Sequence, residues 1–262
     1  MFRYARLLGV QLRASALLTL QYRLDFFVSG VMSIFWTATA LVPLLVLFQQ
    51  RQTVAGWTWH EALLVVAWFT VLKGVLEGGI EPALQNVVEH IRKGTLDFIL
   101  LKPADAQFLV STSKFEVWKS ADVLGGALLL TWALMQANLT PSPGAIAATI
   151  ALLACAVSIL YSLWILVISL AFVVVKIDNL SYLLESIFDA ARWPSSVFRG
   201  ALALLFTFVI PLAVMTTYPA LALLGRLESW RLGAAVGGAA AFALVSRLVW
   251  TRAIARYTSA GG

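Results

Sequence analysis

The chain has 262 residues, of which 61% are hydrophobic and only 12% are charged. Its mean hydropathy of +0.88 is too high for a soluble domain of this length. The composition therefore predicts an all-α integral membrane protein with a single domain over residues 1–262. The net charge of +6 does not indicate nucleic-acid binding, because the basic residues group by predicted side of the membrane.

The first predicted element is an amphipathic helix over residues 1–23. Arg3, Arg6 and Arg13 fall within about 80° of one another at the helical period, and the leucines lie mostly on other sides. This pattern is typical of a helix at the inner membrane surface, with its cations among anionic headgroups. The alternative is a simple positively charged flank of the first span.

Six transmembrane helices follow in the prediction. An apolar run of about 20 residues crosses the ~30 Å hydrocarbon core. Runs of this kind give spans at residues 26–48, 62–79, 120–137, 145–175, 196–215 and 231–250. The connection between the first two spans carries Trp57 and Trp59, which suit the aromatic belt at the outer interface.

The distribution of Lys and Arg fixes the predicted orientation. With both termini cytoplasmic, 15 of the 19 basic residues lie inside, including Arg192 and Arg199 in or after a second inner loop near residues 176–195. The outside has only Arg51, Arg226 and Arg231, and Lys73 lies within a span. This asymmetry indicates a multi-pass protein of the bacterial inner membrane.

Residues 80–119 form the largest inner connection. A helical pattern ends at Gly94, where Thr95 can cap a second short helix that Pro103 stops. The second helix has an apolar face with charged flanks, which suits insertion into a groove on another protein. The alternative is a loop helix that lies on the membrane.

The uncharged run over residues 200–225 is longer than one crossing needs and is interrupted by two prolines. We expect a re-entrant segment near residues 215–224, since irregular backbone at this depth must be covered by protein or line a wet cavity. A kinked, lipid-facing helix is the alternative. The candidate outer gate consists of Pro211, Met215, Tyr218 and Pro219.

Charged and small residues within the spans have structural interpretations. Lys73 and Glu77 are four residues apart, which favours a local ion pair at the inner interface over a proton relay. Two Gly-x-x-x-Gly patterns, at residues 74–78 and 233–237, predict close packing of helices within the chain, and the alternative for each is a seam between two permeases.

Sites for cofactors or metals are not indicated. His60 and His90 lack other metal-ligating residues nearby, and the chain contains no Gly-x-x-x-x-Gly-Lys-Ser/Thr phosphate loop. The prediction is therefore a non-enzymatic protein without a metal or cofactor of its own.

A basic pair, Arg92-Lys93, precedes the sequence Gly94-Thr95-Leu96-Asp97 and then Leu100-Leu101-Lys102-Pro103, with Lys114 further on. In this position, between spans two and three, the motif resembles the cytoplasmic signature of the type-2 ABC exporter permeases. Asp97 stands where glutamate is common in that family, which preserves the charge. The N-terminal helix, the six spans and the interrupted segment after the fifth span resemble the same family.

The resemblance implies a permease that works with a dimer of ABC ATPase subunits, which would bind ATP and Mg²⁺. It also implies a second six-span permease, either a paralogue or a second copy of this chain. The cytoplasmic coupling helix would seat in a cleft of the ATPase, with Leu96 to Leu101 as an apolar knob inside a polar rim. The implied coupling residues are Glu89, Arg92, Lys93, Gly94, Thr95, Leu96, Asp97, Phe98, Leu100, Leu101, Lys102 and Pro103.

Two other functions are compatible with a membrane protein of this size. A secondary transporter or channel not coupled to ATP is disfavoured, because the spans hold few ionisable groups and no visible repeat. An enzyme acting on lipid would need a cluster of acids, histidines or a nucleophile with its base at the interface, and none is apparent.

Overall fold

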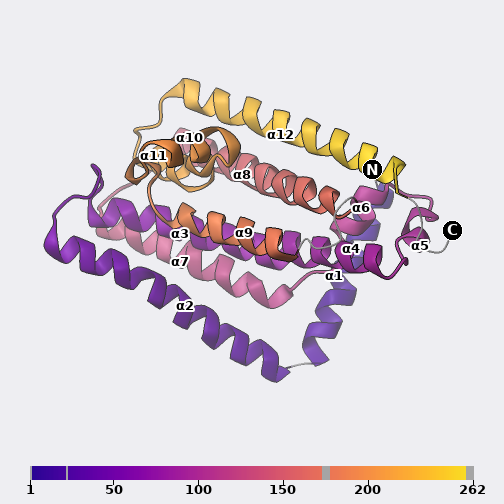
Figure 1. Cartoon of the computed structure of the whole chain (residues 1–262). Coiled ribbons are helices and arrows are strands. Elements are labelled where there is room, and N and C mark those ends of the chain that lie inside the picture. The colour runs from indigo at the N-terminus through magenta and orange to yellow at the C-terminus, as the bar shows by residue number, and fades with distance from the viewer. Residues whose placement is uncertain (1, 22, 173–177, 258–262) are drawn as a thin grey trace.

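A computed structural model describes residues 2–21, 23–172 and 178–257. The fold is all-helical, with 82% of the chain in helices and no strand in these ranges (Figure 1). The helices are α1 Phe2–Gln21, α2 Arg23–Gln50, α3 Trp59–Val75, α4 Glu81–Arg92, α5 Asp97–Leu100, α6 Ala106–Ser111, α7 Ser120–Gln136, α8 Pro143–Ser169, α9 Asp178–Phe188, α10 Ala201–Leu204, α11 Tyr218–Leu223 and α12 Ser229–Ala255.

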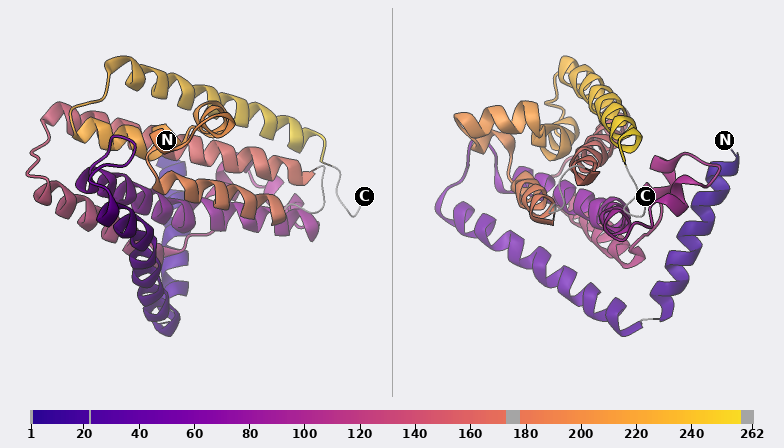
Figure 2. Two further views of the ribbon diagram at one scale, coloured as in Figure 1. Left: turned by 60° about the vertical axis from the view of Figure 1, so that its left-hand side comes forward. Right: turned by 45° about the vertical axis from the view of Figure 1, so that its right-hand side comes forward.

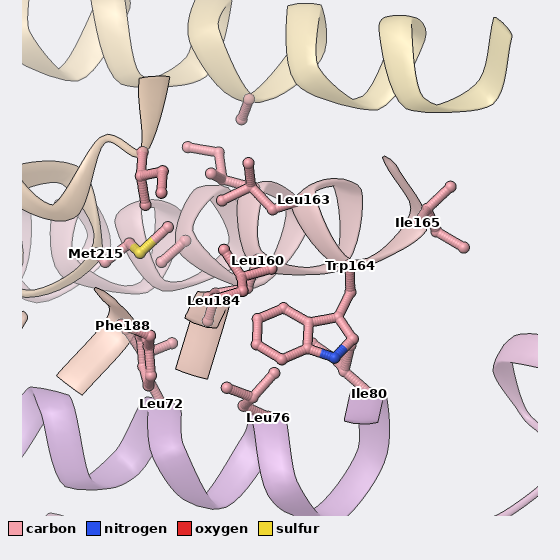
Figure 3. Close-up of a cluster of buried hydrophobic side chains, with 14 of the residues drawn as sticks. Leu72, Leu76, Ile80, Leu160, Leu163, Trp164, Ile165, Leu184, Phe188 and Met215 are labelled. Atoms are coloured by element: carbon pink, nitrogen blue, oxygen red, sulfur yellow. The ribbon is translucent and has the colours of Figure 1, made fainter. Parts of the chain in front are cut away.

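The main core lies where α3, α8 and α9 meet. Trp164 of α8 is 1% exposed, and its indole ring lies among Leu76, Ile80 and Leu184 (Figure 3). Met215, from the segment before α11, packs into the same cluster and is fully buried. Side chains from distant parts of the sequence thereby hold the membrane helices together.

Four helical stretches in the described ranges are long and apolar enough to cross a membrane, namely Gly30–Gln50, Trp59–Arg92, Pro143–Phe172 and Ser229–Ala255. They correspond to the first, second, fourth and sixth predicted spans. α7, with 17 residues, coincides with the third. The second stretch joins α3 to α4 through a π-helical turn, Leu76–Ile80. At 1.5 Å per residue its 34 residues extend about 50 Å, so one end projects beyond a ~30 Å hydrocarbon core.

Two glycines allow the close contact between α3 and α7. A Cβ atom at Gly126 of α7 would lie 2.7 Å from the Val71 backbone nitrogen and 2.9 Å from the Ala67 carbonyl oxygen. A Cβ atom at Gly74 of α3 would lie 2.7 Å from a methyl group of Val123. The predicted packing role of Gly74 within the chain is therefore confirmed.

The second glycine pattern behaves differently. Gly233 and Gly237 on α12 have no atom within 4 Å of an added Cβ among the described residues. The prediction that these two glycines pack within the chain is wrong, because they lie on a face of α12 that no other described helix covers.

The boundaries of the fifth predicted span are wrong. Ser196 accepts a hydrogen bond from the Trp57 indole at 3.1 Å and donates to the Ala55 carbonyl oxygen at 3.2 Å. Ser196 therefore lies at the Trp57 end of the bundle, whereas the predicted span 196–215 begins at the opposite end. α9 lies alongside α3, with the Phe69 and Phe188 rings 5.2 Å apart (Figure 1).

The residues that follow α9 continue toward the Trp57 end. Asp189 and Arg192, placed by the prediction in an inner loop, pair with each other at 2.9 Å beside the middle of α3. Arg192 and Arg199 therefore do not lie at the end that carries residues 80–119. The charge asymmetry remains, since most other basic residues keep their predicted end.

The segment after α9 forms a bent pair. Ala201–Val209 and Ala213–Leu223 are inclined at 69° to each other across the break at Pro211. The first limb is largely exposed, as at Phe208, whereas the second is buried against α3 and α8. A lipid-facing helix, the alternative for this segment, does not fit the buried second limb.

The N-terminal helix, the 80–119 connection and the last turns of α12 gather at one end of the molecule. Arg3 donates to the Pro103 carbonyl oxygen, and the Tyr4 and Phe108 rings are 4.8 Å apart. Arg247 of α12 pairs with Asp105. The prediction that these three regions share one side is consistent with this arrangement.

Candidate functional site

The turn between α4 and α5 is a helix-ending motif built around glycine. Gly94 has φ +65°, a left-handed conformation that glycine adopts without a Cβ clash. The Thr95 and Gly94 amides donate to the His90 and Ile91 carbonyl oxygens at 2.9 and 3.2 Å, which closes the end of α4 as a Schellman motif. The predicted helix break at Gly94 is therefore confirmed.

The predicted cap of the second short helix is wrong. The Thr95 hydroxyl lies 2.7 Å from His90 Nδ1, and Leu96, without a side-chain hydrogen bond, occupies the N-cap of α5. Thr95 therefore secures the turn to α4 and does not cap the following helix. α5 is one turn long and ends at Leu100, before Pro103.

The apolar residues of α5 and its flanks divide into buried and exposed sets. Leu96 is fully buried in the chain's own core, and Ile99 and Leu100 pack against that core. Phe98 and Leu101 are 69% and 81% exposed. Leu96 is therefore not part of a surface knob, and the exposed apolar surface consists of Phe98 and Leu101.

Charged residues surround these two side chains. Lys93 pairs with Glu89 at 2.6 Å on the last turns of α4. Arg92, Lys93, Phe98, Leu101, Lys102 and Pro103 are all exposed at this end of the molecule. We call this set the docking surface. A hollow of about 390 Å³, lined by Phe98 and Lys102 among others, lies beside it.

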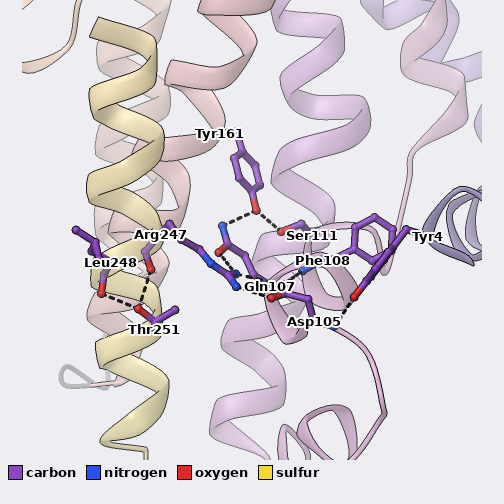
Figure 4. Close-up of polar contacts among 9 residues, drawn as sticks. All are labelled: Tyr4, Asp105, Gln107, Phe108, Ser111, Tyr161, Arg247, Leu248 and Thr251. Atoms are coloured by element: carbon purple, nitrogen blue, oxygen red, sulfur yellow. Dashed lines mark hydrogen bonds and ion pairs between the residues drawn. The ribbon is translucent and has the colours of Figure 1, made fainter. Parts of the chain in front are cut away.

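A polar cluster fixes the base of the docking surface to the membrane helices (Figure 4). Asp105 caps α6 by accepting from the Phe108 amide at 2.9 Å, and its carboxylate also accepts from Arg247 of α12 at 3.2 Å. Arg247 donates to Gln107 Oε1 at 2.7 Å as well. One guanidinium therefore ties both Asp105 and α6 to the last membrane helix.

The same cluster reaches α8. Gln107 donates to the Tyr161 hydroxyl at 2.9 Å, and that hydroxyl lies 2.7 Å from the Ser111 hydroxyl. Tyr4 of α1 accepts from the Asp105 amide at 3.2 Å. Sequence reasoning did not identify this cluster. The signal that would have found it is Arg247, a cation in an apolar helix that needs a partner.

Replacing Asp105 by asparagine tests the ion pair alone, because asparagine caps helices as well as aspartate does. The Arg247 guanidinium holds the pKa of the Asp105 carboxyl below its usual range. Such a group stabilises the fold above its unfolded pKa, near 3.9, and loses this contribution as pH falls through the lower folded pKa. We expect Asp105→Asn to lower the unfolding free energy at pH 7 by less than about 1 kcal/mol, since the pair is half-exposed.

The measurement is denaturant unfolding of both proteins in detergent at several pH values. The two unfolding free energies should converge as the pH approaches the lowered pKa of Asp105. A difference that persists undiminished in acid would mean that the asparagine acts through something other than the lost charge.

Three of the predicted outer-gate residues lie in the second limb of the bent pair, and Pro211 lies in the break before that limb. Pro211, Met215 and Pro219 are buried, and Tyr218 is partly exposed with the Arg231 guanidinium 5.8 Å from its ring centroid. The Thr216 hydroxyl donates to the Ala191 carbonyl oxygen at 2.7 Å. This segment is thus held by the residues that follow α9 as well as by α8. Its role as a gate stays a prediction.

Lys73 and Glu77 form the predicted local ion pair, with their charged atoms 3.5 Å apart. The pair is one part of a longer series. Lys73 also lies 3.8 Å from Asp189, and Lys119 contacts Glu77 and lies 3.5 Å from Asp122. With Arg192 on Asp189, positive and negative groups alternate across five helical elements. We call this series the charge chain: Arg192, Asp189, Lys73, Glu77, Lys119 and Asp122.

Among known protein families, residues 34–261 match the family described as "ABC-2 family transporter protein". This range takes in α3 to α12, together with most of α2. The search of curated proteins and the search of solved structures each found no match.

Proposed function

Because the chain belongs to the ABC-2 transporter family, we propose that it is the permease of an ATP-driven exporter, with a separate ATPase supplying the energy. Association with an ABC ATPase and with the bilayer follows from the family. The chain itself lacks a phosphate loop, so ATP and Mg²⁺ are bound by the partner.

The proposed topology has six crossings, with a corrected fifth span. They are α2, the α3–α4 stretch, α7, α8, the stretch that contains α9, and α12, while the bent pair enters and leaves on one side. Both termini are then on the side of the docking surface. The basic residues at that end support a cytoplasmic location in a bacterial inner membrane.

The docking surface is the proposed contact with the ATPase, and the exposure of Phe98 and Leu101 is the observation that carries this proposal. Exposing large apolar side chains to water outside the hydrocarbon region is unfavourable, and a partner that covers them removes this free-energy cost. The charged rim and the adjacent hollow suit a protein surface that receives a short helix in a cleft.

Energy transfer would follow the contacts of the docking surface. Leu96 in the core and the cluster around Arg247 connect the surface to α8 and α12, and the continuous α3–α4 stretch connects it to the second span. A closing ATPase dimer that binds one permease state more tightly would shift the balance between inward and outward states. A second six-span permease, a paralogue or another copy of this chain, would complete the translocation pathway.

Co-purification tests the proposal. We expect the wild-type chain to co-purify with an ABC ATPase of the same organism, and the double variant Phe98→Asp/Leu101→Asp to lose that ATPase while it still inserts and folds. Two buried anchors at an interface are each worth about 2 kcal/mol or more, so the combined loss exceeds a hundredfold in affinity.

The matched control is Phe98→Leu/Leu101→Met, which keeps both positions apolar and should retain the ATPase. Undiminished binding by the aspartate variant would remove the docking surface from the proposal. Failure of the wild-type chain to bind any ABC ATPase would contradict the proposed ATP-driven function.

A further inference from the structure

A cavity of about 710 Å³ lies between α2 and the rest of the bundle. Figure 2 shows α2 inclined away from the other helices, and its Met32, Trp36 and Ala40 line one side of the cavity. Phe69 and Thr70 of α3 line the other. Cavities that bind small ligands usually measure about 300–1,000 Å³, so this one can hold a ligand of substantial size.

The floor of the cavity is the charge chain, since all six of its residues line the same space. Three are positive and three are negative, so the floor has no net charge. A simple anion or a simple cation would meet repulsion and attraction in similar amounts. A group that carries both charges can place each one beside its opposite within a few ångströms.

Two residues of the charge chain are accessible to such a group. Lys73 is held loosely, 3.5 Å from Glu77 and 3.8 Å from Asp189, and the Lys73 and Asp189 side chains are 36% and 44% exposed. Lys119, by contrast, is 16% exposed and contacts two carboxylates. Arg192 holds Asp189 Oδ2 at 2.9 Å, but Asp189 Oδ1 has Lys73 only at 3.8 Å. Incoming charges can therefore pair with Lys73 and with Asp189 Oδ1 without breaking the tight Arg192 ion pair.

The wall above these charges is apolar and aromatic. Trp36 is 63% exposed and Met32 is 51% exposed, and both border the cavity with Phe69 opposite. An apolar chain or ring lying here would be covered by both helices and removed from water. The cavity thus offers a charged region for the polar end of a molecule and, next to it, an apolar region for the body of the same molecule.

We propose that this cavity binds an amphipathic zwitterion, a molecule with a positive and a negative group at one end and an apolar body at the other. Its anionic group pairs with Lys73, its cationic group with Asp189, and its body lies against Trp36 and Phe69. That the bound molecule is cargo or a lipid that regulates transport rests on the proposed function, but binding itself does not. A phospholipid of the bilayer and a water-borne amphiphile share this chemistry.

The experiment measures equilibrium binding of labelled lysophosphatidylethanolamine, which is zwitterionic, and of lysophosphatidylglycerol, which is anionic, to the full chain in nanodiscs. We expect the zwitterion to bind at least about tenfold more tightly, a difference of ~1.4 kcal/mol. Nanodiscs made with phosphatidylethanolamine should suppress binding if a bilayer lipid is the occupant. Suppression only by an added water-soluble zwitterionic amphiphile would assign the site to a water-borne molecule.

Substitutions on α2 distinguish binding in the cavity from binding of the probe to the surrounding lipid. Ala40→Trp fills the cavity and should weaken zwitterion binding about tenfold or more, whereas Ala38→Trp, on an exposed face outside the lining, should leave it unchanged. Thr37→Phe repeats the test from a second lining position if Ala40→Trp fails to fold. The double variant Lys73→Met/Asp189→Asn keeps the floor neutral and should abolish the preference for the zwitterion.

Equal binding of both lipids by the wild-type chain would overturn the proposal, as would normal binding by folded Ala40→Trp and Thr37→Phe. Occupation of the cavity by a helix of a second permease would also overturn it, and crosslinking from position 40 detects that case. None of these measurements uses the ATPase, so failure of the proposed coupling and failure of this site give different results.

Discussion

Replacing Gly126 by alanine is expected to destabilise the protein, whereas the same change at its neighbour Gly125 is expected to stabilise it slightly. An alanine Cβ at position 126 would lie 2.7 Å from the Val71 backbone nitrogen, closer than such atoms approach in proteins. Because backbone cannot rotate away as a side chain can, α3 and α7 must separate. Overpacking of this kind costs about 1–3 kcal/mol.

Gly125 is the matched control because an added Cβ there has no atom within 4 Å among the described residues. Its replacement by alanine should gain roughly 0.5–1 kcal/mol from the better helix propensity of alanine. Thermal unfolding in detergent would compare the two variants. Similar melting temperatures for both would contradict the close approach of α3 and α7.

Replacing Lys119 by methionine is expected to lower the unfolding free energy even more than replacing Gly126 does. Lys119 is 16% exposed and is the cation shared by Glu77 and Asp122, whose side chains are 24% and 9% exposed. Methionine has a similar length but leaves the Asp122 carboxylate with the Ser33 hydroxyl as its one hydrogen-bond partner among the described residues. Removing one partner of a buried ion pair costs about 3–5 kcal/mol, because the other charge stays buried.

Lys114→Met is the control, since Lys114 is 56% exposed and its pair with Glu116 should be worth less than about 1 kcal/mol. The double variant Lys119→Met/Asp122→Leu removes the stranded carboxylate and should recover part of the loss. Unfolding free energies in detergent give both comparisons. If the double variant is no more stable than Lys119→Met, the burial of Asp122 is not the cause of the loss.

Several parts of the fold could be predicted because their cause is local. Long apolar runs must form helices in a bilayer, and these runs gave the positions of α2, α3, α8 and α12. Gly94 marked the end of α4 because a left-handed turn favours glycine. The break at Pro211 also has a local cause, since proline removes a backbone hydrogen-bond donor from a helix.

The stretch that contains α9 was missed because its charges hide it from a hydropathy analysis. Asp189 and Arg192 suggest a loop when they are considered alone. They neutralise each other, and Lys73 lies beside Asp189. The free-energy cost of placing these charges within the membrane helices therefore depends on Lys73, more than 100 positions away in the sequence. A composition window contains no information about such partners.

The break at Gly94 and the short helix after it were predicted, but which of the helix's apolar side chains are exposed was not. Leu96 and Leu101 look equivalent in the sequence, yet one is fully buried and the other is 81% exposed. Which side of a one-turn helix faces the core depends on how α4 and α6 hold it, and periodicity over four residues cannot determine this. Gly126 was overlooked for a similar reason, because its partner Val71 is on another helix.

The π-helical turn at Leu76–Ile80 joins α3 to α4 within the second membrane-spanning stretch. A π-turn accommodates one residue more than regular α-helical winding, and each residue of an α-helix corresponds to about 100° of rotation. Shortening the chain by one residue at this point would restore regular α-helical winding and leave α4, with Phe98 and Leu101, facing nearly the same way, whereas a deletion in the regular part of α4 would turn them by about 100° relative to α3. The direction in which Phe98 and Leu101 face is therefore insensitive to the loss of one residue at this turn, but sensitive to the same loss in the regular helix on either side of it.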